Sequence, residues 1–338
     1  MIKKILIIGP SWVGDMIMAQ TLFKLIKQSD PNSQIDVLAP DWSLPVLQRM
    51  PEVNTIIAMP VRHGEFGLLQ RIAIARTLRK QNYTQAIVLA NSWKSALIPF
   101  LAKIPIRSGW LGEMRWGLLN DVRYLDKKSL PKMVQRYAAL GLGSRHALPS
   151  VLPTPKLLAA ADSVTTVLNK FALDTAKPIL ALCPGAAYGP AKRWPMEYFA
   201  QIAKQKIAAG WQVWFFGSNQ DSLVIDNIRG QILETTISFA AKIDLLETID
   251  LLSVVNAVVT NDSGLLHMAA SLDKPLVAIY GSTSAEFTPP LGPKSKIVQE
   301  DLPCRPCFKR ECPLRHLNCM YLIKPERVLS AIDELEAQ

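Results

Sequence analysis

The feature that most constrains the fold is an alternation of short, mostly apolar runs with amphipathic helical stretches. Runs typical of buried strands occupy residues 3–8, 34–38, 85–89, 179–183 and 276–280, and helical patterns lie between most of them. Apolar residues fill most of these positions rather than every second one, which is typical of parallel strands covered on both faces. The sequence therefore predicts the α/β class, with doubly wound parallel sheets.

A proline-rich stretch separates two such series. Residues 143–155 contain three prolines and show no helix or strand periodicity, as expected of a linker. A chain of 338 residues is also too long for one ordinary hydrophobic core. We therefore predict two Rossmann-like domains that face an interdomain cleft, over residues 1–150 and 151–324, followed by a C-terminal helix over residues 325–338.

The overall charge points to an acidic partner. Lys and Arg outnumber Asp and Glu by 38 to 28, a net charge of +10, which favours nucleic acid, an anionic membrane or a phosphorylated substrate. The cations are scattered, and no Lys/Arg block is long enough for a nucleic-acid-binding arm. The apolar run after Lys3 and Lys4 ends within four residues, too short for a signal peptide, and no run approaches membrane-spanning length. We expect a soluble, cytoplasmic protein without a transmembrane segment.

The segment after the strand at 179–183 has the composition of an anion-binding loop. Residues 184–191 are proline, glycine, alanine and one tyrosine, followed by a cation pair at 192–193. A helical pattern then begins, for which Pro195 suits the first position. Small residues let backbone N–H groups approach phosphate oxygens, while the helix dipole and the Lys192 ammonium add positive charge. The alternative is a surface loop with two solvated cations.

A second nucleotide-binding segment is expected at residues 261–267. Asp262 or Ser263 can cap the helix that follows, Gly264 permits close backbone approach, and His267 falls in the first turn. Such a helix start can receive ribose hydroxyls or a diphosphate. An ordinary N-cap beside a packed histidine is the alternative.

Two further predicted strands in this half also end at glycine. One ends at Gly217-Ser218 and the other at Gly281. Open α/β sheets bind ligands beyond the carboxyl ends of their strands. Several glycine-bearing strand ends in one domain therefore favour a nucleotide site.

In the first half, the turn after the opening strand carries a carboxylate. Residues 9–15 contain glycine only at positions 9 and 14, so neither the dinucleotide fingerprint nor a Walker A loop is present. The turn places Asp15 at the carboxyl edge of the first strand, where ligands bind. Asp15 is either a structural helix-start carboxylate or a base that faces the cleft, and position alone leaves both open.

Four of the five cysteines are clustered near the C-terminus. Their spacing is C-x2-C-x4-C-x6-C, at Cys304, Cys307, Cys312 and Cys319. A cytoplasmic location disfavours stable disulfides, and four thiolates can close a tetrahedral zinc site, although this spacing is tighter than the usual two-knuckle zinc pattern. The sequence leaves a structural metal site and a reduced, metal-free loop both open. The fifth, Cys183, is expected in the core at a strand end.

Five segments together strongly resemble the bacterial ADP-heptose:lipopolysaccharide heptosyltransferases of glycosyltransferase family 9, in particular their heptosyltransferase II group. The match runs in order over nearly the whole chain, at residues 9–15, 90–95, 112–121, 183–195 and 260–267. The resemblance implies a GT-B fold with an acceptor-binding first domain, an ADP-sugar-binding second domain and a last helix that packs back on the first. It also implies an inverting, metal-independent transfer that needs no cofactor besides the ADP-heptose donor.

The resemblance implies roles for individual residues as well. Asp15 matches the catalytic base and Lys192 the lysine that binds the donor phosphates. With the loops identified above, the donor-binding residues are expected to be Gly185, Ala186, Lys192, Gly217, Ser218, Asp262, Ser263, Gly264 and His267. Candidates for binding an anionic acceptor are Trp12, Lys94, Arg107, Arg115 and Arg136. Each of these cations alone is more often a solvated surface charge.

The implied chemistry agrees with these residue types. One carboxylate removes the acceptor hydroxyl proton while ADP leaves from the opposite face of the sugar, and Lys192 with backbone N–H groups stabilises the charge on the diphosphate. By resemblance, the acceptor is the first heptose of heptosyl-Kdo2-lipid A, an anionic glycolipid. We thus expect peripheral association with the inner face of the inner membrane and no nucleic-acid partner. The alternatives are a GT-B transferase or epimerase that uses a UDP-sugar, and a basic nucleic-acid-binding protein.

Overall fold

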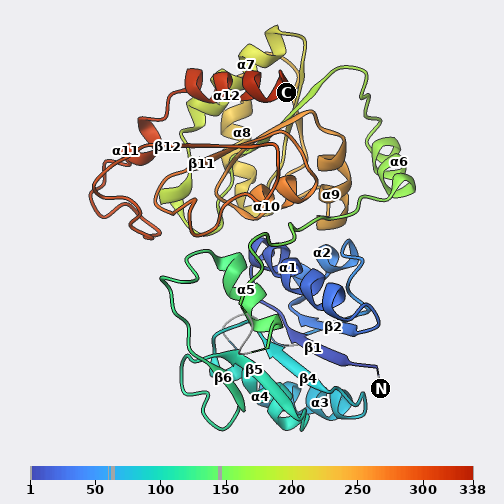
Figure 1. The fold of residues 1–338 in the computed structure, drawn as a ribbon. Coiled ribbons are helices and arrows are strands. Elements are labelled where there is room, and N and C mark those ends of the chain that lie inside the picture. The colour runs from blue at the N-terminus through green and yellow to red at the C-terminus, as the bar shows by residue number, and fades with distance from the viewer. Residues whose placement is uncertain (1, 60, 62–64, 144–146, 338) are drawn as a thin grey trace. The chain divides into compact units, whose positions relative to one another are not determined.

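The computed structural model describes residues 2–59, 61, 65–143 and 147–337 and divides into two compact units, Met1–Pro155 and Lys156–Gln338 (Figure 1). The division falls after residue 155 rather than after residue 150, and hydrogen bonds explain why. Thr21 and Lys24 donate to the carbonyls of Pro153 and Thr154, which ties the end of the predicted linker to the first unit. Residues 144–146 of that linker lie outside the described part of the chain.

The first unit contains a parallel sheet in the order β3-β2-β1-β4-β5-β6. Its strands are β1 (Lys4–Ile8), β2 (Gln34–Ala39), β3 (Thr55–Ala58), β4 (Gln85–Val88), β5 (Ile106–Trp110) and β6 (Asp121–Arg123). Its helices are α1 (Val13–Ser29), α2 (Leu44–Gln48), α3 (Leu68–Arg79), α4 (Trp93–Leu101) and α5 (Met133–Gly141), with a 3-10 turn η1 (Asp41–Ser43). Helices α1, α2 and α5 lie on one face of the sheet, and α3 and α4 on the other (Figure 1). Leu6 and Ile8 face the core shared with α3 and α4, while Ile5 and Ile7 are equally buried opposite, which explains the apolar run.

The second unit repeats this architecture with the order β12-β11-β10-β7-β8-β9. Its strands are β7 (Ile179–Cys183), β8 (Gln212–Phe215), β9 (Ile237–Ser238), β10 (Ala257–Asn261), β11 (Leu276–Tyr280) and β12 (Ser295–Gln299). Its helices are α6 (Ala161–Lys170), α7 (Met196–Ala208), α8 (Ser222–Arg229), α9 (Leu245–Val254), α10 (Gly264–Ser271), α11 (Asn318–Tyr321) and α12 (Pro325–Glu336), with 3-10 turns η2 (Pro190–Lys192) and η3 (Asn219–Asp221). The prediction of two doubly wound parallel sheets is confirmed.

Counted from the first strand of each unit, both sheets have the order 3-2-1-4-5-6. In this Rossmann order the chain changes direction between the first and fourth strands, and ligands bind beyond the carboxyl ends of these two strands. The strands in question are β1 and β4 in the first unit, and β7 and β10 in the second. The loops that follow them carry most of the predicted site residues.

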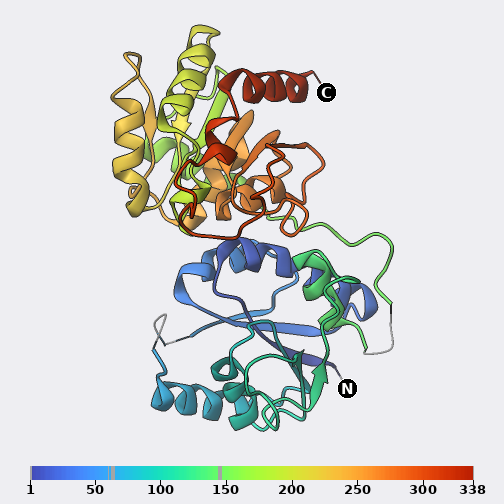
Figure 2. The same cartoon turned by 90° about the vertical axis from the view of Figure 1, so that its left-hand side faces the viewer.

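The last helix contributes to the core of its own unit. Val328, Ile332 and Leu335 of α12 are buried there, while the expectation that the helix also packs back on the first domain stays a prediction. Figure 2 shows α12 (red) beside α7, and the helix also contacts β11 and β12. The apolar face of α12 is therefore covered within the second unit.

Candidate functional site

A buried ion pair joins the two central loops of the second unit. Lys192, after β7, places Nζ 2.6 Å from Oδ2 of Asp262, after β10, and their side chains are only 13% and 5% exposed. The Thr283 hydroxyl, after β11, donates to the same carboxylate oxygen at 2.6 Å. Asp262 therefore holds the Lys192 ammonium at the carboxyl edge of the sheet.

This pairing also decides how α10 begins. Helix α10 follows Ser263, and within the described residues no side chain caps it by a hydrogen bond. Of the two predicted alternatives, Ser263 occupies the N-cap position, although its side chain makes no capping hydrogen bond. Asp262 is not the cap, because its carboxylate is engaged by Lys192 and Thr283. Backbone N–H groups at the start of a helix are suited to an anion. Gly264, the first residue of α10, adds no side chain in front of them.

His267 lies one turn into α10 and is buried. Burial lowers the pKa of His267 to about 4, the Asp262 carboxylate raises it and the Lys192 ammonium lowers it. The imidazole is therefore neutral at neutral pH. The imidazole lies close enough to the ion pair for both charges to act on its pKa. The structure therefore brings Lys192, Asp262 and His267 together, as predicted.

The Tyr188 ring contacts both the Lys192 ammonium and a second cation, the Arg310 guanidinium. The Lys192 ammonium lies 4.9 Å from the centre of the Tyr188 ring, and the Arg310 guanidinium lies 5.5 Å from it. The Tyr188 hydroxyl donates to the carbonyl of Phe308 at 2.7 Å. The sequence-based prediction omitted Arg310, whose approach to Tyr188 depends on the path of a distant loop.

Asn261, at the end of β10, holds the anion-binding loop at both ends. Its side-chain amide donates to the carbonyl of Pro184 at 2.7 Å, and its Oδ1 accepts from the backbone N–H of Trp194 at 3.1 Å. Asn261 is fully buried, so these bonds are shielded from water. The same loop shows one departure from prediction: Pro195 precedes α7 as its N-cap rather than occupying its first position.

A second buried carboxylate, that of Asp221, lies against the glycines that follow β7 and β8. Asp221 Oδ2 accepts from the backbone N–H and the hydroxyl of Ser218 at 2.9 and 2.7 Å. A Cβ at Gly185 would lie 2.4 Å from Cγ of Asp221, and one at Gly217 2.9 Å from its Cβ. Both glycines are therefore required by close approach. The sequence indicated the glycines but not the carboxylate that they accommodate.

In the first unit, Asp15 lies in the first turn of α1 and is half-buried. It is hydrogen-bonded to Tyr137 of α5, and burial, followed by the charge and hydrogen bond of Asp15, raises the pKa of Tyr137 well above its usual value. Tyr137 therefore remains protonated and donates to the Asp15 carboxylate. Sequence reasoning missed Tyr137, which lies more than a hundred residues away.

Three of the predicted acceptor-binding residues lie in, or directly before, the first turn of a helix. Trp12, half exposed, directly precedes α1, and Lys94 is in the first turn of α4 after β4. Arg136 precedes Tyr137 in α5, and its Nε donates to the carbonyl of Leu130 at 2.9 Å. Trp12 and Lys94 thus follow β1 and β4, the two strands between which the chain changes direction in the first sheet.

The other two candidates are structural arginines. Arg107 lies near the amino end of β5 and donates to the carbonyls of Ile104 and Leu118 at 2.6 and 2.7 Å. Arg115 is 1% exposed, and its guanidinium binds the carbonyls of Ala90, Trp110 and Gly112. Burial lowers the pKa of Arg115, and nearby Glu113 raises it. We assign both residues to holding loops rather than to binding an acceptor.

The clustered cysteines line a pocket of their own. All four are free thiols, as is Cys183, which is buried at the end of β7 as predicted. Within the part of the chain that the structure describes, no three Cys, His, Asp or Glu side chains stand close enough together, as placed, to hold a metal ion. The pocket is lined by the four cysteines and His316, among others.

Comparisons with known proteins give matches over most or all of the chain. The family model described as glycosyltransferase family 9 (heptosyltransferase) matches residues 71–318. Lipopolysaccharide heptosyltransferase 2 of Salmonella typhimurium is 42% identical over 98% of both chains, and lipooligosaccharide heptosyltransferase 2 of Haemophilus influenzae is 47% identical over 87% of this chain and 88% of its own. The solved structure of the ADP-heptose lps heptosyltransferase II of E. coli superposes with a TM-score of 0.90 at 42% identity, covering 99% of each chain.

Proposed function

Because the chain belongs to glycosyltransferase family 9 (heptosyltransferase), and so is a transferase that acts in lipopolysaccharide core biosynthesis, we propose ADP-heptose as its donor and the first heptose of the inner core as its acceptor. The observation that carries the donor assignment is the Lys192–Asp262 pair at the edge of the second sheet. A diphosphate at the start of α10 meets both the ammonium and the helix N–H groups. Neutral His267 adds no charge of its own.

The proposed reaction inverts the anomeric centre in one displacement. The Asp15 carboxylate accepts the proton of the acceptor hydroxyl while the hydroxyl oxygen attacks the anomeric carbon of the heptose. The bond from that carbon to the diphosphate breaks, and its electron pair leaves on ADP. Lys192 and the first N–H groups of α10 stabilise the charge that grows on the diphosphate. The Tyr137 hydroxyl donates a hydrogen bond to the Asp15 carboxylate and so orients it for this step.

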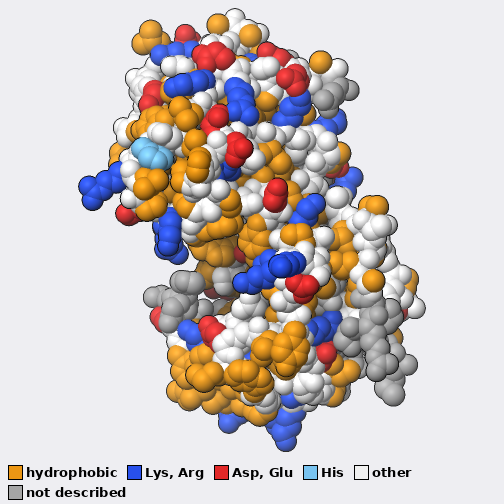
Figure 3. All heavy atoms as spheres, turned by 60° about the vertical axis from the view of Figure 1, so that its left-hand side comes forward, with side chains coloured by type: hydrophobic (Ala, Val, Ile, Leu, Met, Phe, Trp, Pro, Cys, Tyr) orange, Lys and Arg blue, Asp and Glu red, His pale blue; other side chains and the backbone are white. Residues whose placement is uncertain are grey.

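The proposed acceptor is an anionic glycolipid at the inner face of the inner membrane. Trp12, Lys94 and Arg136 remain the candidates to bind it. No helix among the described residues is long and apolar enough to cross a bilayer. We propose that the protein reaches its acceptor by peripheral association. On the face drawn in Figure 3, Lys and Arg are interspersed with Asp and Glu rather than gathered in one continuous basic patch, which does not favour nucleic acid.

A reconstituted transfer assay tests the proposal. Purified protein is incubated with ADP-heptose and heptosyl-Kdo2-lipid A, and both ADP release and the mass of the lipid product are measured. We expect the acceptor to gain one heptose, and we expect Kdo2-lipid A without its first heptose to be inert. Transfer to both lipids, or to neither, would contradict the proposed acceptor.

The donor is tested separately by thermal shift. A ligand that binds only the folded protein raises the melting temperature, and we expect ADP but not UDP to do so. A shift with UDP alone would instead support the UDP-sugar alternative. Flotation with anionic and neutral vesicles tests membrane association, for which we expect recovery with the anionic ones.

A further inference from the structure

The loop that carries the cysteine cluster (Cys304, Cys307, Cys312 and Cys319) is unusually long for a segment without regular structure. Between the end of β12 at Gln299 and the start of α11 at Asn318 there is no helix or strand among the described residues. Loops longer than about 12–15 residues are uncommon in compact domains and are usually functional or held by something other than secondary structure.

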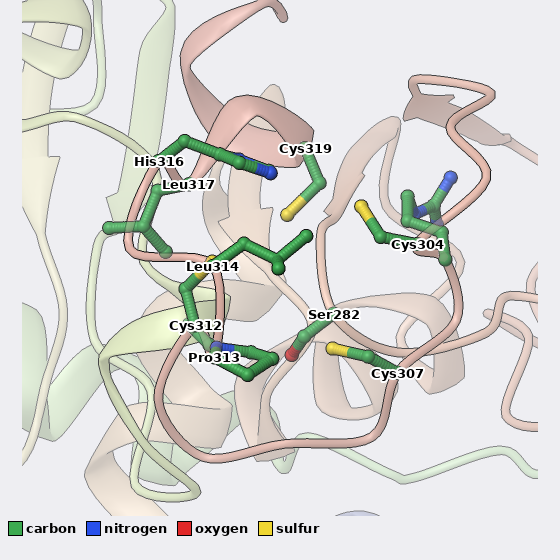
Figure 4. A pocket seen from close by; sticks show the side chains of 11 residues that line it. Ser282, Cys304, Cys307, Cys312, Pro313, Leu314, His316, Leu317 and Cys319 are labelled. Carbon is green, nitrogen blue, oxygen red and sulfur yellow. The ribbon is translucent and has the colours of Figure 1, made fainter.

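The four thiols face a common space. They line one pocket together with Ser282 and His316, and Figure 4 shows the sulfur atoms of Cys304, Cys307 and Cys319 directed into it. The cavity has a volume of only about 20 Å³. A space of that size holds a single ion or water rather than an organic ligand.

Hydrogen-bond donors and a cation surround the sulfur atoms. The backbone N–H groups of residues 314–317 hydrogen-bond to the Cys312 sulfur. The Arg305 guanidinium lies close enough to Cys304 and Cys319 to interact electrostatically with both. Metal-bound thiolates are commonly stabilised by hydrogen bonds and nearby charge of this kind.

We propose that the cysteine cluster binds one structural metal ion, zinc or iron, as a tetrahedral tetrathiolate. Four sulfur ligands in a tetrahedron favour these metals over calcium or magnesium. Because the thiols do not yet stand at metal-ligand spacing, binding must draw them together by rotation of the side chains around the pocket. Each thiol releases one proton to solvent, so a divalent ion and four thiolates carry a net charge of −2, which Arg305 partly offsets.

His316 is the competing ligand. Its Nδ1 accepts from the backbone N–H of Asn318 at 2.9 Å, which leaves Nε2 able to bind a metal, and Figure 4 shows the ring beside Cys319. Four thiolates complete a tetrahedral site without it. Replacement of His316 therefore serves as a matched control, which should leave metal binding by the four thiolates intact.

The site has a structural consequence for the donor loop, and this consequence rests on the proposed function. The cysteine-bearing loop donates from Phe308 N to the carbonyl of Ser282 at 2.8 Å, and its Arg310 carbonyl accepts from Ala191 N at 3.0 Å. Arg305 donates to the carbonyls of Gly281 and Thr283 at 2.6 and 3.1 Å. A metal that fixes this loop therefore also fixes the segments beside Lys192.

Metal content tests the proposal without any substrate. The full-length protein, purified under reducing conditions and without a metal-affinity step, is analysed by inductively coupled plasma mass spectrometry. We expect about one zinc or iron per chain, and charge-transfer bands of cobalt–thiolate bonds after cobalt substitution. Cys304→Ser and Cys312→Ser should lose the metal, whereas His316→Ala should retain it. Loss of metal in His316→Ala with retention in either serine variant would overturn the tetrathiolate.

A second measurement uses the unmodified protein, in case the serine variants do not fold. Titration with a mercurial should release one metal per four thiols modified, and the metal-free protein should be cleaved faster by trypsin at the exposed residues Lys309, Arg310 and Arg315. Wild-type protein that holds less than about a tenth of an equivalent of metal, even after incubation with zinc and a reductant, overturns the proposal. Since neither readout uses ADP or a lipid, failure of the transfer assay leaves this result unaffected.

Discussion

The Lys192–Asp262 pair supports a quantitative prediction for Lys192→Met. This substitution keeps the unbranched shape and most of the length of the side chain and removes its charge. The Asp262 side chain is 5% exposed, so water cannot replace the lost cation, although the Thr283 hydroxyl still donates to the carboxylate. Removal of one partner of a buried ion pair costs about 3–5 kcal/mol. Because Lys192 itself is 13% exposed, we expect the lower end, about 3 kcal/mol.

Two measurements follow from this value. For a unit of this size, about 3 kcal/mol lowers the melting temperature by roughly 6–12 °C. ADP also loses a charge-assisted hydrogen bond, which is worth about 1.5–3 kcal/mol, so its dissociation constant should rise about 10- to 100-fold. Differential scanning calorimetry and isothermal titration with ADP measure the two effects separately.

Lys206→Met is the matched control in the same unit. Lys206 Nζ lies 3.0 Å from Asp333 and 2.7 Å from Glu336, but these carboxylates are 67% and 33% exposed and can be hydrated after the change. We expect a loss of about 1 kcal/mol or less, with unchanged ADP affinity. Equal melting temperatures for the two variants, together with wild-type ADP affinity in Lys192→Met, would refute the reasoning about the buried pair.

Four further predictions concern individual residues. Asp15→Asn should fold and bind ADP normally but lose transfer about 100-fold or more, measured by ADP release; near-normal turnover would remove Asp15 as the base. Tyr137→Phe removes the hydrogen bond that orients the Asp15 carboxylate, which is worth about 1 kcal/mol, and should lower kcat roughly fivefold without weakening ADP binding; an unchanged kcat would contradict its positioning role. The pKa of His267 is lowered from 6.5 to about 4, so between these pH values the imidazole binds fewer protons in the folded than in the unfolded protein. The free energy of unfolding should therefore fall as the pH decreases from 6.5 to about 4, by on the order of 3 kcal/mol in all. Urea unfolding at several pH values should show this slope in the wild type and lose it in His267→Gln. Gly185→Ala forces a Cβ to 2.4 Å from Cγ of Asp221 and should weaken ADP binding in a titration, whereas Ala187→Ser, at an exposed position, should not.

The elements that the sequence predicts best are those with an uninterrupted apolar run. Strands β7 and β11 occur at the predicted bounds, whereas β9 has only two residues and β12, an edge strand, has three polar residues among its five. Short or half-polar edge strands depend on pairing with a neighbour more than on their own composition. This explains why both were missed.

The residues of the candidate site likewise divide into those that the sequence identifies and those that it does not. Lys192, Asp262 and His267 could be identified from their loops, because parallel strands bring their carboxyl ends to one edge. Tyr137 and Asp221 could not, since their partners are determined by the packing of α5 on α1 and by the turn before α8. The structural contacts of Arg107 and Arg115 could not be predicted either, because a sequence does not show that backbone carbonyls surround a guanidinium.

The chain passes from one unit to the other between Pro155 and Lys156, and among the described residues every strand pairing lies within a single unit. A genetic crossover at that point exchanges a complete sheet with all its loops and breaks no ladder. If the acceptor and the nucleotide bind to different units, as we propose, the two preferences can diversify independently in the descendants of such a gene. Chimaeras joined at this residue pair offer a direct way to follow that history in the laboratory.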